Sequence, residues 1–202
     1  MPKIKIKRKS TAVDMTAMTD VAFLLLTFLL LTANFIKPEA VIVAAPSSVS
    51  EIKIPETNIL EILVDPEGRV FIGIDNQEKR AELLKRFGEV YHLSFTAKES
   101  KEFSLTNSFG VPAEKLKAFL DLPSILRGMP ENALGIPCDS TNNQFKEWVR
   151  LVREVNPSIT LAIKADRSTP YPKIKNVMNT LQSLRENRYH LITNLEAMPK
   201  DL

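Results

Sequence analysis

The acidic side chain of Asp20 lies in the most apolar stretch of the sequence. Residues 15–36 comprise 16 apolar and six polar residues, and Asp20 is the one ionisable group among them. A carboxyl group held away from water favours its protonated form, so it can bind and release a proton near neutral pH. A proton that crosses a membrane potential releases about 2.3 kcal/mol per 100 mV, enough to drive a small conformational step. The chemistry available to Asp20 is therefore reversible proton binding coupled to motion.

Further polar side chains share a helical face with Asp20. At about 100° per residue, the residues on the same side of a helix as the acid are Thr16, Phe23, Leu24, Thr27 and Asn34. Three of these five carry polar groups. A polar stripe of this kind is expected on a helix that faces protein or water rather than lipid. We therefore expect a partner to supply the rest of any proton pathway.

The segment around Asp20 is long enough to cross a membrane. As a helix, residues 15–36 would extend about 33 Å at roughly 1.5 Å per residue, against a hydrocarbon core of roughly 30 Å. Their Leu, Phe, Ile and Val side chains favour insertion by about 3 to 6 kcal/mol, which offsets the cost of roughly 3 kcal/mol for a central Asp. The sequence therefore predicts one transmembrane helix.

The charges beside this segment predict its orientation. Lys and Arg number 27 and Asp and Glu 24, but five of the cations lie in the first ten residues. The other 192 residues carry 22 basic and 24 acidic groups, which argues against a nucleic-acid partner. Because basic flanks stay in the cytoplasm, we expect residues 1–14 to be a cytoplasmic tail and the remainder to lie outside.

Two other interpretations of the segment remain open. Residues 1–20 and 21–33 could be the basic and apolar regions of a signal peptide cleaved near Ala45, although their acidic residues fit such a peptide poorly. Alternatively, Asp20 could cap a helix that begins at Val21. That helix would be about 20 Å long, which is too short to span a membrane alone.

Residue types that support other chemistry are scarce. The single Cys138 has no partner for a disulfide or a Cys-x-x-Cys site, and His92 and His190 lack the spacing of zinc ligands. The six Gly form neither a phosphate loop nor a dinucleotide fingerprint, and no Gly-x-Ser-x-Gly motif is present. We therefore expect no enzymatic activity, no cofactor and no metal, and we assign the two histidines structural or surface roles.

The rest of the chain divides into a linker and an α+β domain. Residues 37–57 contain three prolines and predict an extended linker, with a hint of an edge strand around Ile52 and Ile54. In the domain, residues 58–202, two β-branched runs flank the turn Asp65-Pro66-Glu67-Gly68 and predict a hairpin. The runs cover residues 59–64 and 69–74.

Helical spacing and strand patterns fill most of the domain. The last helix is expected to close at Asn187 in a left-handed turn. Flanked by two strands, it forms a strand-helix-strand crossover in a mixed sheet with helices on one face. The predicted helices cover 77–91, 114–122, 143–155 and 172–187, and these two strands cover 159–163 and 189–195. Residues 94–112 show too little periodicity to assign.

Two sets of residues resemble motifs of a known family. The run Val-Asp-Met-Thr-Ala-Met-Thr-Asp-Val-Ala-Phe-Leu-Leu-Leu, residues 13–26, is similar to the start of ExbD/TolR proteins, close to V-D-M-T-P-M-I-D-V-V-F-L-L-L. Near the C-terminus, the matches to the family's A-D-x-x-x-P-Y-G and V-M-D-x-L patterns are Ala165-Asp166, Pro170-Tyr171 and Val177-Met178. The departures from these patterns are Ala17, Thr19, Pro172 and Asn179.

The resemblance implies a function and a set of partners. Asp20 matches the family's membrane-embedded, proton-carrying acid, and similar proteins work as dimers with a multi-pass ExbB/TolQ-type channel protein. This implies an inner-membrane motor subunit with a periplasmic domain, which acts through a TonB/TolA-like energy transducer on outer-membrane transport or envelope integrity. It also implies a linker that docks on a neighbouring subunit, as an alternative to a plain spacer.

The sequence leaves two points undecided, which are the role of residues 78–145 and an alternative function for the chain. Residues 78–145 contain roughly 60 residues more than a compact family member needs, so we interpret this region as an insertion. We expect Asp166 to stabilise a turn rather than to take part in chemistry. The alternative function is a membrane-anchored or secreted periplasmic module that binds peptidoglycan or an envelope protein without proton coupling.

Overall fold

The computed structural model describes residues 15–33, 43–48, 57–129, 131–139 and 141–195. The chain separates into two compact units, residues 1–37 and residues 38–202, which are described in turn. The first unit contains the apolar helix and the second contains an α+β domain. The predicted edge strand around Ile52 and Ile54 lies outside the described residues.

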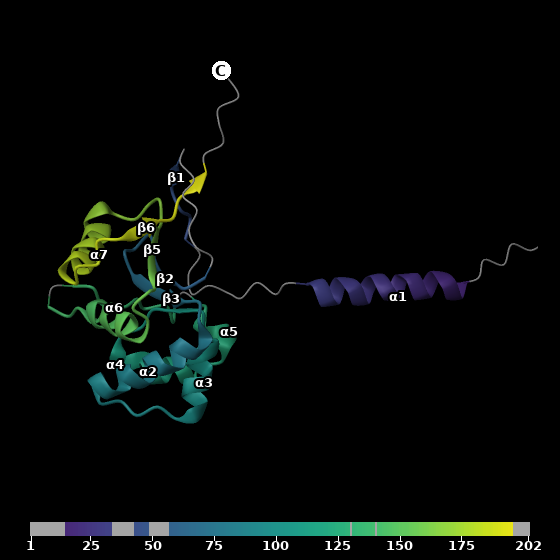
Figure 1. Ribbon diagram of the computed structural model, residues 1–202, viewed down its shortest axis with the longest axis horizontal. Helices are drawn as coiled ribbons and strands as arrows, with labels where there is room; N and C mark the ends of the chain where they lie inside the picture. Colours follow the sequence, from purple (N-terminus) through teal and green to yellow (C-terminus); the bar gives the residue numbers. More distant parts are fainter. Residues whose placement is uncertain (1–14, 34–42, 49–56, 130, 140, 196–202) are drawn as a thin grey trace, which may run out of the picture. The chain divides into compact units, whose positions relative to one another are not determined.

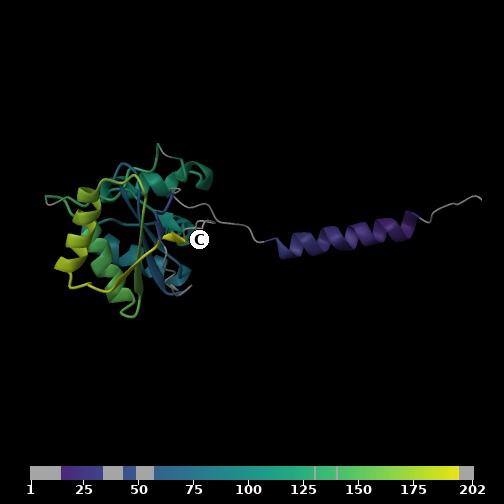
Figure 2. The same ribbon diagram turned by 90° about the horizontal axis from the view of Figure 1, so that it is seen from above.

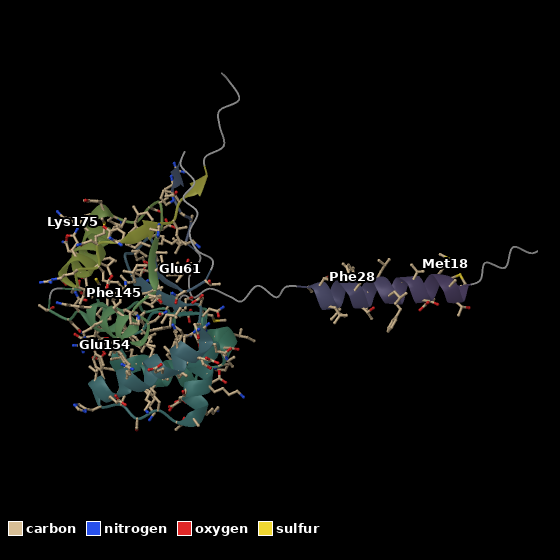
Figure 3. The ribbon with its side chains drawn as sticks, viewed as in Figure 1. Met18, Phe28, Glu61, Phe145, Glu154 and Lys175 are labelled. Atoms are coloured by element: carbon tan, nitrogen blue, oxygen red, sulfur yellow. The ribbon has the colours of Figure 1, made fainter. Side chains whose placement is uncertain are left out.

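The first unit contains helix α1, Met15–Thr32, drawn in purple in Figure 1. Its 18 residues extend about 27 Å and are long and apolar enough to cross a membrane. Its side chains are exposed within the unit, and Met18 and Phe28 project outward in Figure 3. An apolar helix without a buried face requires lipid or another protein around it.

The second unit is built on a five-stranded mixed sheet in the order β4-β3-β2-β5-β6. Strand β2 pairs antiparallel with β3 and parallel with β5, while β3 and β4 are antiparallel and β5 and β6 are parallel. The strands are β2 (Ile59–Val64), β3 (Val70–Ile74), β4 (Ser108–Phe109), β5 (Thr160–Ala165) and β6 (Tyr189–Leu191). The expected α+β class with a mixed sheet is confirmed.

The predicted hairpin is formed by β2 and β3. Gly68 adopts a φ of +80°, which its missing side chain permits, and its N–H donates to the Asp65 carbonyl at 2.9 Å. The carboxylate of buried Asp65 accepts from the Arg69 N–H at 2.7 Å and from its Nε at 2.6 Å. Asp65 therefore stabilises the turn as well as starting it.

Six helices complete the described part of the domain, and four of them match predicted helices. The helices are α2 (Gln77–Tyr91), α3 (Ala97–Leu105), α4 (Ala113–Asp121), α5 (Ser124–Arg127), α6 (Gln144–Val155) and α7 (Tyr171–Ser183). Figure 2 shows α7, in yellow-green, beside α6, in green. Asn143 caps α6 as expected, because its Oδ1 accepts the Lys146 N–H at 2.9 Å.

One unassigned region is now described, and one expectation about local structure needs correction. Residues 94–112, which the sequence left unassigned, contain α3 and β4. The left-handed residue after α7 is Arg185, with a φ of 62°, and not Asn187. The helix ends sooner than predicted, at Ser183, so the N–H groups of Arg185 and Glu186 reach back to Gln182 and Leu181 in a Schellman motif.

The helices pack against one face of the sheet. Alternate residues of β2, namely Leu60, Ile62 and Val64, join a core with side chains from α2, α3, α4, α6 and α7. Trp148 lies at its centre and stacks on Phe87 with ring centroids 3.7 Å apart. Phe145 belongs to the same core and lies inside the domain in Figure 3.

The opposite face of the sheet carries a smaller apolar cluster. Leu63 of β2 and its pairing partner Phe71 of β3 point away from the helices and pack with Val43 and Ala133. Val43 belongs to the predicted linker, so this part of the linker packs on the chain's own domain and is not a plain spacer. Further along, β1 (Ser47–Ser48) pairs in parallel with β7 (Asn194–Leu195).

Candidate proton-carrying site

Helix α1 places the predicted face residues around Asp20. Thr16, Phe23, Leu24 and Thr27 lie on the same helix as the acid, whereas Asn34 lies outside the described residues. Asp20 is the sixth residue of α1, about 8 Å along the axis from its first residue. The helix continues for twelve residues beyond it without another ionisable side chain.

Asp20 lies in a shallow hollow on the surface of α1. The lining residues are Thr16, Ala17, Thr19, Asp20 and Phe23. Ala17 and Thr19 were not among the predicted face residues, although both positions stand out as departures from the family pattern. Their small side chains leave room beside the acid, where a neighbouring helix could approach closely.

The threonine hydroxyls near Asp20 are occupied within the helix. Thr19 Oγ1 donates to the carbonyl of Met15 at 3.0 Å or of Thr16 at 2.9 Å, and Thr27 Oγ1 donates to the Leu24 carbonyl at 2.9 Å. A hydroxyl has one proton and two lone pairs. Each hydroxyl therefore keeps a lone pair that can accept a further hydrogen bond while it donates to the backbone. Thr27 lies seven residues from Asp20, about 10 Å along the helix axis, so only a group on another chain or a water could use its lone pair together with the acid.

Within the part of the chain that the structure describes, the Asp20 carboxyl makes no hydrogen bond or ion pair. A buried carboxylate without partners is costly, and it is stabilised by protonation or by donors from elsewhere. Within residues 15–33, the structure shows no donor to the Asp20 carboxyl.

Asp166 matches a family motif, and its carboxylate has a structural role as a hydrogen-bond acceptor. Its Oδ1 accepts from the Ser168 N–H at 2.9 Å and from the Ser168 hydroxyl at 2.6 Å, and its Oδ2 accepts from the Ala44 N–H at 2.9 Å. These hydrogen bonds, from Ser168 first and then from Ala44, lower the pKa of Asp166 below its ordinary value. The Arg167 N–H donates a hydrogen bond to the Ala44 carbonyl at 3.0 Å.

The remaining candidate side chains lie apart from one another. His92 ends α2 in a left-handed conformation with a φ of 54°, and His190 lies on β6. Cys138 contacts the Thr180 hydroxyl at 3.6 Å, and burial raises the pKa of its thiol. Among the described residues, no three His, Cys, Asp or Glu side chains gather as a metal site.

The architecture and the motifs agree with one family. The family described as Biopolymer transport protein ExbD/TolR matches residues 7–196, which is nearly the whole chain and includes both Asp20 and Asp166. No curated protein and no solved structure matches the chain. Membership supports a membrane protein of biopolymer transport that associates with ExbB/TolQ-type partners in general. The chain belongs to the ExbD/TolR family.

Proposed function

We propose that this chain is the inner-membrane subunit of a proton-driven motor in which Asp20 carries the protons. Residues 1–14 then lie in the cytoplasm, α1 spans the membrane, and the domain lies in the periplasm. The motor couples the proton motive force to outer-membrane transport or envelope integrity through a TonB/TolA-like transducer. Family membership supports energy coupling in general, and the assignment of the proton to Asp20 is ours.

The observation that carries the proposal is the position of Asp20. It is the one ionisable side chain of an 18-residue apolar helix that has no buried residue within its own described unit. An acid in such a segment is costly and, when retained, marks a proton or ion pathway. One helix cannot enclose a pathway, so the acid needs the multi-pass ExbB/TolQ-type partner. Two copies of the chain would place two acids in that pathway.

Replacement of Asp20 by Asn and by Glu tests the proposal in cells that depend on the motor. Asn is nearly isosteric but cannot carry a proton, so Asp20→Asn should abolish energised transport while the chain is still expressed and still co-purifies with its partner. Asp20→Glu is the matched control, because it keeps a titratable carboxyl and should retain part of the activity. Normal transport by Asp20→Asn would instead support an anchored binding module for peptidoglycan or an envelope protein.

A further inference from the structure

A charged hollow lies where helices α6 and α7 end and strands β5 and β6 begin. The parallel pairing of β5 with β6 brings the starts of these two strands together. The volume of the hollow is about 530 Å³, which is within the range of sites for small ligands, about 300 to 1,000 Å³. We call it the arginine hollow, and its charged and titratable lining residues are Arg153, Arg185, Glu186, Arg188 and His190.

The one acid of the arginine hollow is already paired. Arg153 donates from Nε and Nη2 to the two carboxylate oxygens of Glu186, at 2.7 and 2.6 Å. Its Nη1 donates to the carbonyls of Pro157 and Ile159, at 2.7 and 2.9 Å. Such a bidentate ion pair has a fixed geometry, so it ties α6 to the turn after α7. Glu186 therefore compensates Arg153 rather than the other two arginines.

Arg185 and Arg188 keep their positive charges. Both side chains are exposed, and neither forms an ion pair with another residue that the structure describes. The backbone that carries Arg185 is held in place, because its N–H donates to the Gln182 carbonyl at 2.9 Å. The arginine hollow thus presents two uncompensated cations on a short, ordered segment.

The excess of positive charge is local to this part of the domain. Residues 159–195 carry six basic and two acidic side chains, whereas residues 77–158 carry twelve basic and eleven acidic ones. The two acids of the basic part are Asp166 and Glu186, and both accept hydrogen bonds from the domain itself. A concave site of one sign of charge concentrates its field and attracts counter-ions. The arginine hollow therefore favours an anion.

The chemistry of the arginine hollow fits a phosphate group. A guanidinium donates two parallel hydrogen bonds to phosphate oxygens, and a phosphomonoester carries a charge of about −1.5 to −2 at neutral pH. Two arginines neutralise one such group, whereas a monocarboxylate would leave one cation uncompensated. We propose that the arginine hollow binds inorganic phosphate or a phosphomonoester through Arg185 and Arg188, with His190 as a further hydrogen-bond donor. This site does not depend on the role of Asp20.

Thermal unfolding of the full-length chain in phosphatidylcholine nanodiscs tests the site. Fluorescence of Trp148 reports unfolding, and inorganic phosphate replaces chloride at constant ionic strength. A ligand that binds only the folded state raises the unfolding temperature with saturation, whereas exclusion of phosphate from the protein surface affects every variant alike. We expect a saturable rise with phosphate and none with acetate. The absence of a saturable rise, or an equal rise with acetate, would overturn the proposed site.

Substitution of the two unpaired arginines locates the binding. Arg185→Gln and Arg188→Gln should each weaken the binding of inorganic phosphate by about tenfold, because each removes charge-assisted hydrogen bonds. Both change exposed side chains and should unfold at the wild-type temperature in chloride. The matched control is Arg167→Gln, which changes an exposed arginine beyond the other end of β5 and should bind phosphate normally. Unchanged binding in both hollow variants, or equal weakening by Arg167→Gln, would contradict the site.

Nanodiscs that also contain phosphatidic acid identify the source of the phosphate. A lipid head group in the arginine hollow should raise the unfolding temperature of the wild type above that of Arg188→Gln and abolish the further response to inorganic phosphate. A response that persists unchanged would assign the site to a soluble phosphate or phosphomonoester. Either result supports the phosphate site, whereas a response that is the same in the wild type and in both hollow variants overturns it.

Discussion

The carboxylate of Asp166 accepts a hydrogen bond at 2.9 Å from the amide of Ala44, 122 positions earlier in the sequence. The same carboxylate binds Ser168, so one side chain stabilises the turn after β5 and fastens the linker to it. The Arg167 N–H donates a second hydrogen bond, to the Ala44 carbonyl. The linker and the turn therefore share one hydrogen-bond network, and movement of the linker requires that network to open.

Asp166→Asn should weaken the domain in a pH-dependent manner. The hydrogen bonds from Ser168 and Ala44 lower the pKa of Asp166 in the folded state, so its ionised form stabilises the fold above the pKa of an unfolded Asp, about 3.9. This contribution is lost as the pH falls through the folded pKa. We expect the urea midpoints of the wild type and Asp166→Asn to differ most at neutral pH and to converge below about pH 4.

Fluorescence of the single Trp148, buried in the core, reports the unfolding of the domain within the full chain. A difference between the two midpoints that grows toward acidic pH would contradict the assigned role of Asp166. A difference that is constant from acidic to neutral pH would show that the hydrogen bonds do not depend on its ionisation.

Arg80→Met should destabilise the domain by about 3 kcal/mol. The buried guanidinium donates to the carbonyls of Ser104 at 2.9 Å, of Thr106 and of Asp75 at 3.1 Å, and so ties α2 to the end of α3. Its loss leaves the buried Ser104 carbonyl and the partly buried Thr106 and Asp75 carbonyls without this donor. An unpaired buried group costs about 1 to 3 kcal/mol, water can reach the partly buried ones, and removal of the unpaired Nε offsets part of the cost. Urea unfolding measures the change.

Arg86→Met is the matched control for Arg80. Arg86 lies on the same helix but is 40% exposed, and its ion pair with Glu82 is solvated. Its replacement should change the free energy of unfolding by about 0.5 kcal/mol or less. Equal effects of the two substitutions would show that burial of the guanidinium is not what stabilises the packing of α2 on α3.

Gly88→Ala and Gly128→Ala should have opposite outcomes. A Cβ on Gly88 would lie 2.5 Å from the Leu93 carbonyl oxygen, so the segment between α2 and α3 must shift, at a cost of about 1 to 3 kcal/mol. A Cβ on Gly128 meets no atom within 4 Å, and the loss of chain entropy in the unfolded state should make this substitution neutral or slightly stabilising. Thermal unfolding of the two variants, compared with the wild type, distinguishes these effects.

Local patterns predicted the elements that local interactions stabilise. The hairpin followed from the turn residues Asp65 and Gly68, and α6 followed from its cap Asn143 and its apolar spacing. Helix α3 also has a local signal that apolar periodicity does not reveal. Thr96 and Glu99 form a capping box, in which Glu99 accepts the Thr96 N–H at 2.5 Å and Thr96 accepts the Glu99 N–H at 3.2 Å.

Long-range contacts could not be predicted in this way. Arg80 and Arg127 look like surface residues in the sequence, yet both are buried and both bind Thr106, through its carbonyl and its hydroxyl respectively. The packing of Val43 on Phe71 likewise joins segments that share no local pattern. At the candidate site, Asp20 is identified by its apolar surroundings in sequence, but no local pattern identifies the groups with which the proposed function would have it exchange protons.

Proton flux through the reconstituted complex tests the role of Asp20 most directly. Liposomes that contain the chain with its channel partner are given a pH gradient and a membrane potential, and acidification of the lumen is followed with an entrapped dye. We predict that the wild type conducts protons, that Asp20→Glu retains measurable flux, and that Asp20→Asn lowers the flux at least about tenfold, as expected when the proton-binding group is lost. Wild-type flux through complexes that carry Asp20→Asn would contradict the account.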